Sequence, residues 1–444
     1  MKIGRSFRRA KASQGTESVF RGMLTLAMGS GAARLVSVAA IPILSRIYAP
    51  EDYGVLSVFT ALTLLLAPLL TLRYLTALPL PRHEGLALSL LALCGILVAG
   101  GAALVSVLLW TFGPYLLRLM SMEALIPYRW LIVVCLVGAA AYETMVMWAT
   151  RARAYRDIAK TQFTQSALKA LCQIGLGLLA IKPLGLLIGH TVGVSAGLGS
   201  LLWRSRERFR DNARFITWRN IGRVAGGYRS FPLYRLPSQL LLVFSMQAPL
   251  LFTAAIFDAA TTGQLGLAVT ALTMPMSLIG TAVGRAFYGE IAALGKKQPQ
   301  KIYALSKSTQ VRLLLVGIPV ALVIAFFGEE IFIIVFGRQW QEAGIYASWL
   351  APYVLFQLTS APLMNVLNIY DRQGVFLAIN LVRAASLLLL FGAVHQFGLS
   401  SYEFVPAYSV VMTIFYVGIS LYVLYAARQK TLEKKHETSE EVQS

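Results

Sequence analysis

The stretch MLTLAMGSGAARLVSVAAIPILSRIY, residues 23–48, is apolar over its whole length apart from Arg34 near its middle and Arg46 near its end. A helix needs about 20 apolar residues to cross the hydrocarbon core of a bilayer. The apolar part of a signal peptide is only about 7–15 residues long, so this stretch predicts a first transmembrane helix. A cation near the bilayer centre costs at least about 2.5 kcal/mol. We therefore expect Arg34 to face an anion or a water-filled cavity.

The remainder of the chain has the same apolar character. Of its 444 residues, 57% are hydrophobic and 14% are charged, whereas soluble domains are about 25% charged. This composition predicts an all-α polytopic membrane protein. The three cysteines, Cys94, Cys135 and Cys172, each lie in an apolar run. We interpret them as apolar filler rather than as a disulfide framework or a metal site.

The same length rule predicts about twelve transmembrane helices in two pseudo-symmetric six-helix lobes. The predicted spans are 22–47, 53–80, 86–110, 129–150, 159–181, 184–203, 232–257, 262–286, 310–336, 345–369, 374–397 and 403–426. Lys182 and Pro183 alone separate spans five and six, which predicts a tight hairpin. The expected domains are a basic N-terminal segment at 1–21, an N-lobe at 22–203, a basic linker at 204–230, a C-lobe at 231–427 and a tail at 428–444.

The basic residues predict the orientation of these helices. Of the 40 Lys and Arg residues, 28 lie in segments on one side of the membrane, five on the other side and seven within spans. Cytoplasmic loops collect Lys and Arg, so both termini are expected in the cytoplasm. The eight arginines of 204–230 stand among Phe and Trp. We interpret this segment as a helix on anionic lipid headgroups rather than as a nucleic-acid site.

The two halves show a loose internal repeat. A proline, a glycine and a second proline recur, with the second proline 26 positions after the first: Pro42, Gly54 and Pro68, then Pro249, Gly263 and Pro275. Such a repeat implies a two-fold axis along the membrane normal, which is a transporter arrangement. We expect the second proline of each set to break its helix.

Seven cations lie inside predicted spans: Arg34, Arg73, Lys169, Arg235, Arg285, Arg312 and Arg383. Helical rise places Arg34 about 18 Å from the inner face, and Lys169 and Arg383 about 14 Å from it. The other four lie nearer the cytoplasmic ends, where snorkelling to the headgroups is the alternative. The sequence predicts an anion-binding cavity with Arg34, Lys169, Arg383, Arg285, Arg73 and Arg235, because guanidinium groups bind phosphate and carboxylate well.

Polar residues on two spans are candidates to line the same cavity. Gln162, Ser166 and Gln173 share one helical face with Lys169. Gln357 and Asn365 form a weaker counterpart in span ten. Hydrogen bonds between helices are the alternative role for both sets. Of the few embedded acids, Glu143 and Glu290 are expected either to pair with a cation or to bind a coupling ion.

The sequence contains no P-loop, no GxSxG motif and no zinc-ligand cluster. We therefore expect a transporter rather than an enzyme, with no catalytic residues, no metal and no cofactor. The expected energy source is an ion gradient, with H+ or Na+ as the coupling ion, the gradient of the substrate itself, or removal of the product downstream.

Three segments resemble a known family. The segments LSRIYAPEDYGVLSVFTAL (44–62), LRYLTALPLPR (72–82) and YRSFPLYRLPSQLL (228–241) are similar to bacterial polysaccharide flippases. These are the Wzx-type O-antigen and exopolysaccharide transporters of the multidrug/oligosaccharidyl-lipid/polysaccharide superfamily. In many relatives an acid follows the Arg-Tyr pair of span two, where this chain has Leu75.

The resemblance implies two lobes that open alternately to either side of a bacterial inner membrane. It implies a cationic central cavity, with Arg34 on a cavity-lining helix, that handles an undecaprenyl-pyrophosphate-linked oligosaccharide for lipopolysaccharide O-antigen or exopolysaccharide synthesis. The implied partners are this lipid, the anionic headgroups and the downstream glycan polymerase machinery, with no nucleic acid. Two alternatives remain: an ion-coupled multidrug or small-solute antiporter of the same superfamily, and an integral-membrane glycan polymerase or transferase.

Overall fold

The computed structural model describes the backbone of residues 3–295, 298–370 and 373–443. Side-chain surroundings are described within 25–433, apart from 296–297, 371–373 and 376. The basic side chains of 1–21, of the tail beyond 433 and at 296, 297 and 372 lie outside these described residues. All regular structure in the described part of the chain is helical, which confirms the expected all-α class.

The helices follow one another with short connections. The first part of the chain forms α1 (Ile3–Ile47), α2 (Pro50–Thr71), η1 (Tyr74–Ala77), α3 (Glu84–Thr111), α4 (Gly113–Leu119), η2 (Glu123–Tyr128), α5 (Arg129–Arg151), α6 (Tyr155–Leu178), α7 (Leu184–Ser195), α8 (Leu198–Asn212), η3 (Ala213–Phe215), α9 (Trp218–Gly227) and η4 (Phe231–Arg235). The second part forms α10 (Leu236–Ile256), α11 (Ala259–Leu294), α12 (Pro299–Phe336), η5 (Arg338–Trp340), α13 (Gln341–Leu363), α14 (Asn365–Ile369), α15 (Gln373–Phe397) and α16 (Ser401–Gln443).

The chain divides into two compact units. The N-terminal unit contains Met1–Tyr48 and Val55–Val243, and the C-terminal unit contains Ala49–Gly54 and Phe244–Ser444. The first turn of α2 therefore belongs to the C-terminal unit, and the boundary falls inside α10.

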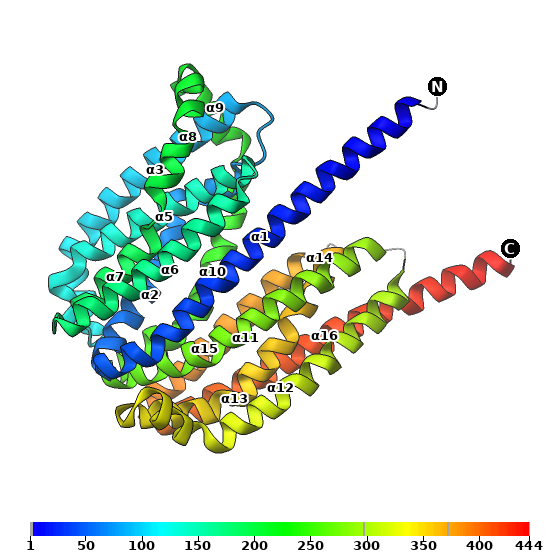
Figure 1. Ribbon diagram of the computed structural model, residues 1–444. Coiled ribbons are helices and arrows are strands. Elements are labelled where there is room, and N and C mark those ends of the chain that lie inside the picture. The colour runs from blue at the N-terminus through cyan, green and yellow to red at the C-terminus, as the bar shows by residue number, and fades with distance from the viewer. Residues whose placement is uncertain (1–2, 296–297, 371–372, 444) are drawn as a thin grey trace. The chain divides into compact units, whose positions relative to one another are not determined.

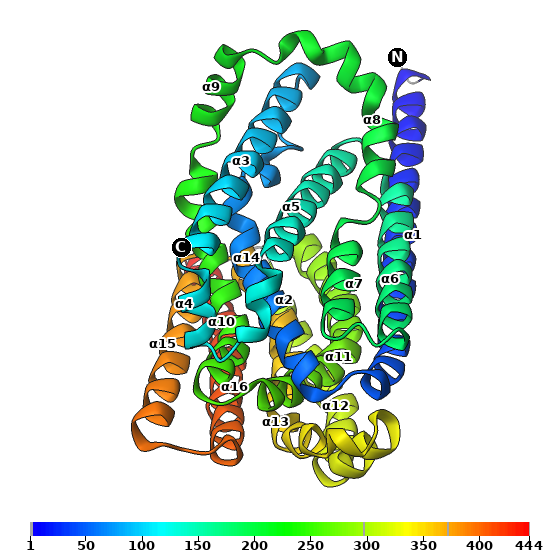
Figure 2. The same cartoon turned by 90° about the vertical axis from the view of Figure 1, so that its left-hand side faces the viewer.

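Within the N-terminal unit, helix packing runs from α1 to α6, then to α7, α5 and α3 (Figures 1 and 2). Glycines on α7 allow its close approach to α6. A Cβ atom on Gly189 would lie 2.3 Å from Cγ of Gln173, and one on Gly193 would lie 2.8 Å from Cβ of Lys169. Small residues at helix interfaces let membrane helices pack closely. This close packing fixes the position of the polar face of α6.

The arginine-rich segment 204–230 also packs within the N-terminal unit. It comprises the end of α8, then η3 and α9. Ile221 and Val224 of α9 join a buried cluster with Tyr74 and Leu90, and α9 lies beside α3 in Figure 2. The segment therefore contributes to a hydrophobic core.

In the C-terminal unit, α13 is the central helix and contacts α11, α12 and α16. Its crossing with α12 depends on two glycines. A Cβ atom on Gly344 would lie 2.7 Å from the carbonyl oxygen of Gly328, and one on Gly328 would lie 2.3 Å from Oγ of Ser348. Helices α12 and α13 therefore approach too closely at these positions to admit a Cβ atom on either glycine.

Eleven helical segments in the described residues are long and apolar enough to cross a membrane. Their number is one fewer than the predicted twelve. Helix α6 accounts for the difference: it is 24 residues long, sufficient to span the hydrocarbon core, but it carries four glutamine and lysine residues between Gln162 and Gln173. These polar residues make α6 less apolar than the other spans, so it is not counted among the eleven.

The predicted proline breaks were wrong. Helix α2 continues through Pro68 to Thr71, and α11 continues for 36 residues through Pro275. The chain of α2 turns instead at Leu72 and Arg73, which have φ angles of 45° and 60°. Proline is tolerated inside membrane helices because neighbouring groups satisfy the carbonyl that loses its partner.

Candidate functional site

The predicted cations lie in both units. The N-terminal unit holds Arg34, Arg73, Lys169 and Arg235, and the C-terminal unit holds Arg285 and Arg383.

Arg383 lies in α15 and is only 8% exposed. Its Nε and one terminal nitrogen donate to Oγ of Ser245 at 3.1 and 2.9 Å, and the same terminal nitrogen donates to Oδ1 of Asn380 at 3.1 Å. The other terminal nitrogen donates to the hydroxyl of Tyr416 at 3.2 Å. No carboxylate lies within ion-pair distance of Arg383 among the residues that the structure describes. The guanidinium is hydrogen-bonded, but its charge is not neutralised.

Hydroxyl and amide groups extend this site around Arg383. The Tyr416 hydroxyl also accepts a hydrogen bond from Nε2 of Gln357 at 3.2 Å, so Gln357 belongs to the same network. The ring of Tyr353 lies 5.5 Å from that of Tyr408 and 5.9 Å from that of Tyr416. Oriented hydroxyl dipoles stabilise a buried cation without removing its charge.

Sequence reasoning found Arg383 and Gln357 but missed their partners. Ser245, Asn380, Tyr353, Tyr408 and Tyr416 were not among the predicted residues. Asn380 precedes Arg383 by three residues, so helical spacing places both on one face. The serine and the tyrosines stand singly in apolar runs and give no comparable signal.

Lys169 lies near the middle of α6, and its stem lies against Gly193 of α7. Its ammonium has no hydrogen-bond or ion-pair partner in the described part of the chain. Helix α6 packs against α7 and also touches α5. Lys169 is therefore an unneutralised cation held between α5, α6 and α7.

The polar residues that share the face of Lys169 form hydrogen bonds between helices. The Ser30 hydroxyl on α1 donates to Oε1 of Gln162 at 2.5 Å, and the Ser37 hydroxyl donates to Oγ of Ser166 at 3.3 Å. Nε2 of Gln173 donates to the carbonyl of Leu186 on α7 at 3.0 Å. These contacts agree with the interhelical alternative for Gln162, Ser166 and Gln173.

Arg34 lies on the side of α1 that meets α6. It is four residues after Ser30 and three before Ser37, and this spacing places the three on one helical face. Arg34 is partly buried. Helices α1 and α6 pack along one another, so the cations at 34 and 169 belong to neighbouring helices of one unit.

Arg73 is paired. One of its terminal nitrogens lies 3.3 Å from Oε1 of Glu143, with the two side chains 16% and 41% exposed. Glu143 of α5 therefore takes the charge-pairing role, one of the two that we expected for it. The pairing neutralises Arg73, in contrast to Lys169 and Arg383.

The remaining predicted residues are not gathered with these groups. Arg235, Arg285, Arg312 and Glu290 are exposed. Asn365 donates to the carbonyl of Pro362 in its own segment at 3.1 Å. In each unit one cation that is not exposed, Lys169 or Arg383, has no carboxylate partner among the described residues.

The arrangement of helices is that of the MATE transporters. An inward-facing multidrug resistance transporter of the MATE family in the MOP superfamily matches with a TM-score of 0.55 and 13% identity, covering 91% of this chain and 95% of that chain. A mutant of the Vibrio cholerae MATE transporter VcmN matches with a TM-score of 0.56 and 15% identity, covering 94% and 98%. The eukaryotic MATE transporter AtDTX14 matches with a TM-score of 0.51 and 16% identity, covering 93% and 98%. At such low identity these matches establish the fold alone.

The protein is therefore a multi-pass membrane protein with this transporter fold. The family model described as polysaccharide biosynthesis protein matches residues 43–344, and the chain belongs to that family. The succinoglycan biosynthesis transport protein ExoT of Rhizobium meliloti (strain 1021) is 25% identical over 314 residues, which are 68% of this chain and 59% of ExoT. The match thus spans about three-fifths of the length of that relative. The family expected from residues 44–62, 72–82 and 228–241 is confirmed.

Proposed function

We propose that the protein is a flippase that moves an undecaprenyl-pyrophosphate-linked oligosaccharide across a bacterial inner membrane during polysaccharide synthesis. Membership of the polysaccharide biosynthesis family supports the substrate class. The similarity to ExoT, a protein named for transport in succinoglycan biosynthesis, supports a role in transport.

The observation that carries the proposal is that Lys169 and Arg383 lack a counter-charge among the described residues. Each lies within a membrane-length helix, and neither has a carboxylate partner among the described residues. An embedded cation without a counter-charge is costly, and such residues usually serve a substrate or ion pathway. A diphosphate would supply the negative charge that such a cation lacks.

Lys169 and Arg383 would interact with the phosphate groups in different ways. The Lys169 ammonium is a compact point charge with no hydrogen-bond partner among the described groups, so it suits a mobile phosphate oxygen. The Arg383 guanidinium is already held by Ser245, Asn380 and Tyr416, so it would act mainly through its field. Arg34, on the α1 face that meets α6, would add a third cation.

Transport would proceed by alternating access, with the polyprenyl tail remaining in lipid and an H+ or Na+ gradient as the energy source. Glu143 is assigned to charge pairing because it already contacts Arg73. The glycan polymerase machinery would take up the product.

Proteoliposomes that contain the purified full chain test this function. The probe is an undecaprenyl-pyrophosphate oligosaccharide with a fluorescent sugar, and the readout is the fraction of probe accessible to a membrane-impermeant quencher. We expect accessibility to change with the protein present and to stay constant in protein-free vesicles. Equal traces in both, or transport of a cationic drug but not of the lipid, would overturn the assignment.

A further inference from the structure

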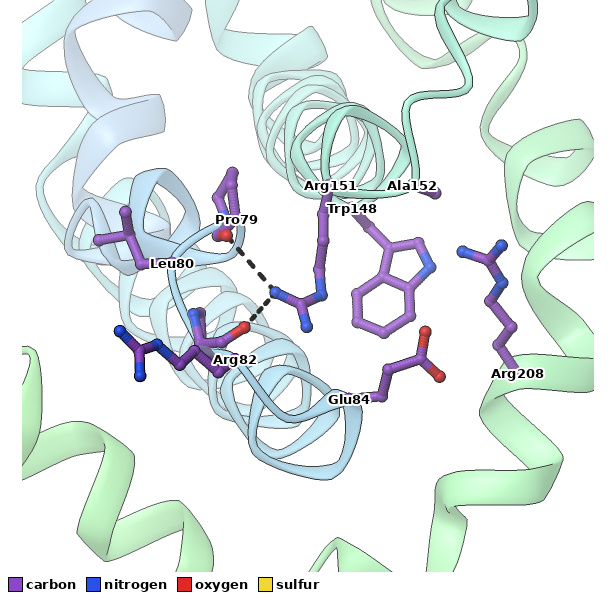
Figure 3. A pocket seen from close by; sticks show the side chains of 9 residues that line it. Pro79, Leu80, Arg82, Glu84, Trp148, Arg151, Ala152 and Arg208 are labelled. Atoms are coloured by element: carbon purple, nitrogen blue, oxygen red, sulfur yellow. Dashed lines mark hydrogen bonds between the residues drawn. The ribbon is translucent and has the colours of Figure 1, made fainter. Parts of the chain in front are cut away.

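A second cationic feature lies at the end of the N-terminal unit where α3 begins and α5 ends. A cavity of about 370 Å³ is lined there by the 79–82 segment and by Glu84, Trp148, Arg151 and Arg208, among others (Figure 3). This volume is within the range of small-molecule sites. The lining contains three arginines and one glutamate, so its formal charge is positive.

Arg151 is fixed in the wall of this cavity. One of its terminal nitrogens donates to the carbonyl oxygens of Pro79, at 3.4 Å, and of Pro81. Figure 3 shows its guanidinium between the 79–82 segment and the indole of Trp148. The other nitrogens of Arg151 have no hydrogen-bond partner among the described residues. They are therefore available to bind an anion.

Trp148 supplies a buried donor without an acceptor. Its side chain is 3% exposed, and its Nε1 has no hydrogen-bond partner in the described residues. Buried indole N–H groups usually have a partner, and an unsatisfied one is destabilising. In Figure 3 the nitrogen lies on the side of the indole that faces Arg208, so an acceptor bound there would satisfy it.

The start of α3 adds to the positive potential. Its N-cap residue, His83, makes no side-chain hydrogen bond to the first turn. Uncapped N–H groups and the helix dipole favour an anion at this end. Glu84 opposes this effect, and its Oε2 accepts a hydrogen bond from Nδ2 of Asn212 at 3.3 Å.

The surface beside the cavity has the character of a membrane interface. Trp203 and Trp218 are 68% and 79% exposed, and the guanidinium of Arg206 lies 3.6 Å above the Trp203 ring. Exposed tryptophans among arginines are typical of helices that lie among lipid headgroups.

We propose that this cavity binds a phosphate group, held by Arg151, Arg208 and the indole N–H of Trp148, with Arg82 adding charge at its rim. The chemistry suits the headgroup of an anionic membrane lipid or free inorganic phosphate. This site is separate from the transport function proposed above and does not depend on it.

The test uses the full chain labelled with 5-fluorotryptophan and observed by 19F NMR. The Trp148→Phe variant identifies the Trp148 resonance. One arm titrates inorganic phosphate into protein in neutral detergent. The other compares nanodiscs of phosphatidylcholine with nanodiscs that contain phosphatidylglycerol. A Trp148 shift in the first arm identifies free phosphate as sufficient, and a shift in the second arm alone identifies the lipid headgroup. Absence of a shift in both arms would overturn the site.

Two variants of equal charge sharpen this test. Arg208→Gln removes a lining cation, and Arg210→Gln removes an exposed arginine two residues further along α8, about 200° around the helix. We expect Arg208→Gln to raise the ligand concentration at the titration midpoint at least fivefold. Arg210→Gln should leave that midpoint unchanged. Glu84→Gln should tighten binding because it removes the opposing charge. Equal losses at 208 and 210, or weaker binding in Glu84→Gln, would reject the assigned geometry.

Discussion

Gly54 and Gly263 meet where the first turn of α2 crosses the beginning of α11. A Cβ atom on Gly54 would lie 1.9 Å from the carbonyl oxygen of Ala259, and one on Gly263 would lie 1.8 Å from that of Pro50. Both contacts lie in the C-terminal unit. The two glycines that correspond in the internal repeat therefore also face one another in space.

This crossing predicts a large effect from adding one methyl group. Gly54→Ala and Gly263→Ala should each destabilise the protein by about 1–3 kcal/mol, because the backbone must move to admit the Cβ atom. Thermal unfolding of the purified protein in detergent measures the change. Gly284→Ala, on the same α11 in open space, should be neutral or stabilising by up to about 1 kcal/mol. Similar melting curves for all three variants would mean that α2 and α11 do not cross this closely.

The network around Arg383 predicts that a positive charge alone does not preserve stability at this position. Arg383→Lys keeps the charge, but one ammonium cannot reach Ser245, Asn380 and Tyr416 as the guanidinium does. An unpaired buried polar group costs about 1–3 kcal/mol, so Arg383→Lys should unfold at lower denaturant than wild type. Tyr416→Phe, which removes one acceptor, should cost about 1 kcal/mol. A fully stable Arg383→Lys would show that these bonds contribute nothing.

The bond between Ser30 and Gln162 predicts a measurable coupling between α1 and α6. The Ser30 hydroxyl donates to the amide oxygen of Gln162 across the two helices at 2.5 Å. Interhelical hydrogen bonds of this kind average about 0.6 kcal/mol. A double-mutant cycle with Ser30→Ala and Gln162→Leu should give a coupling of that size in unfolding experiments. If the effects of the two single substitutions on unfolding simply add, the two side chains are not in contact.

The Arg73–Glu143 pair predicts a weak, salt-dependent interaction. Because the Glu143 side chain is 41% exposed, the pair should contribute only about 0.2–1 kcal/mol. A cycle of Arg73→Gln and Glu143→Gln at low salt should recover this coupling, and 1 M salt should reduce it. A coupling that does not change with salt would mean that the pair is sequestered from solvent.

The sequence predicted those features that depend on local pattern. Helix lengths follow from apolar runs, and the end of α6 at Leu178 and start of α7 at Leu184 agree with the hairpin predicted at Lys182 and Pro183. Proline breaks were mispredicted at Pro68 and Pro275, because propensity in water does not describe a helix supported by its neighbours.

The surroundings of the cations could not be predicted in the same way. Arg383 is bonded to Ser245, 138 residues earlier in the chain, and an isolated serine in an apolar run has no periodic signature. The pairing of Arg73 with Glu143 spans 70 residues. Depth in the membrane follows from counting residues, whereas the neutralisation of a charge depends on tertiary contacts.

The central claim is that cations in the transmembrane helices bind an anionic lipid-linked glycan during its transport. The most direct measurement is translocation of the fluorescent undecaprenyl-pyrophosphate oligosaccharide by the double variant Arg34→Ala/Lys169→Ala in proteoliposomes. Arg206→Gln/Arg210→Gln, which removes two exposed arginines of α8, is the control of equal charge. We predict that the first variant, folded by its melting curve, transports at least tenfold more slowly, whereas the control keeps the wild-type rate. Wild-type transport by the Arg34/Lys169 variant would contradict the claim.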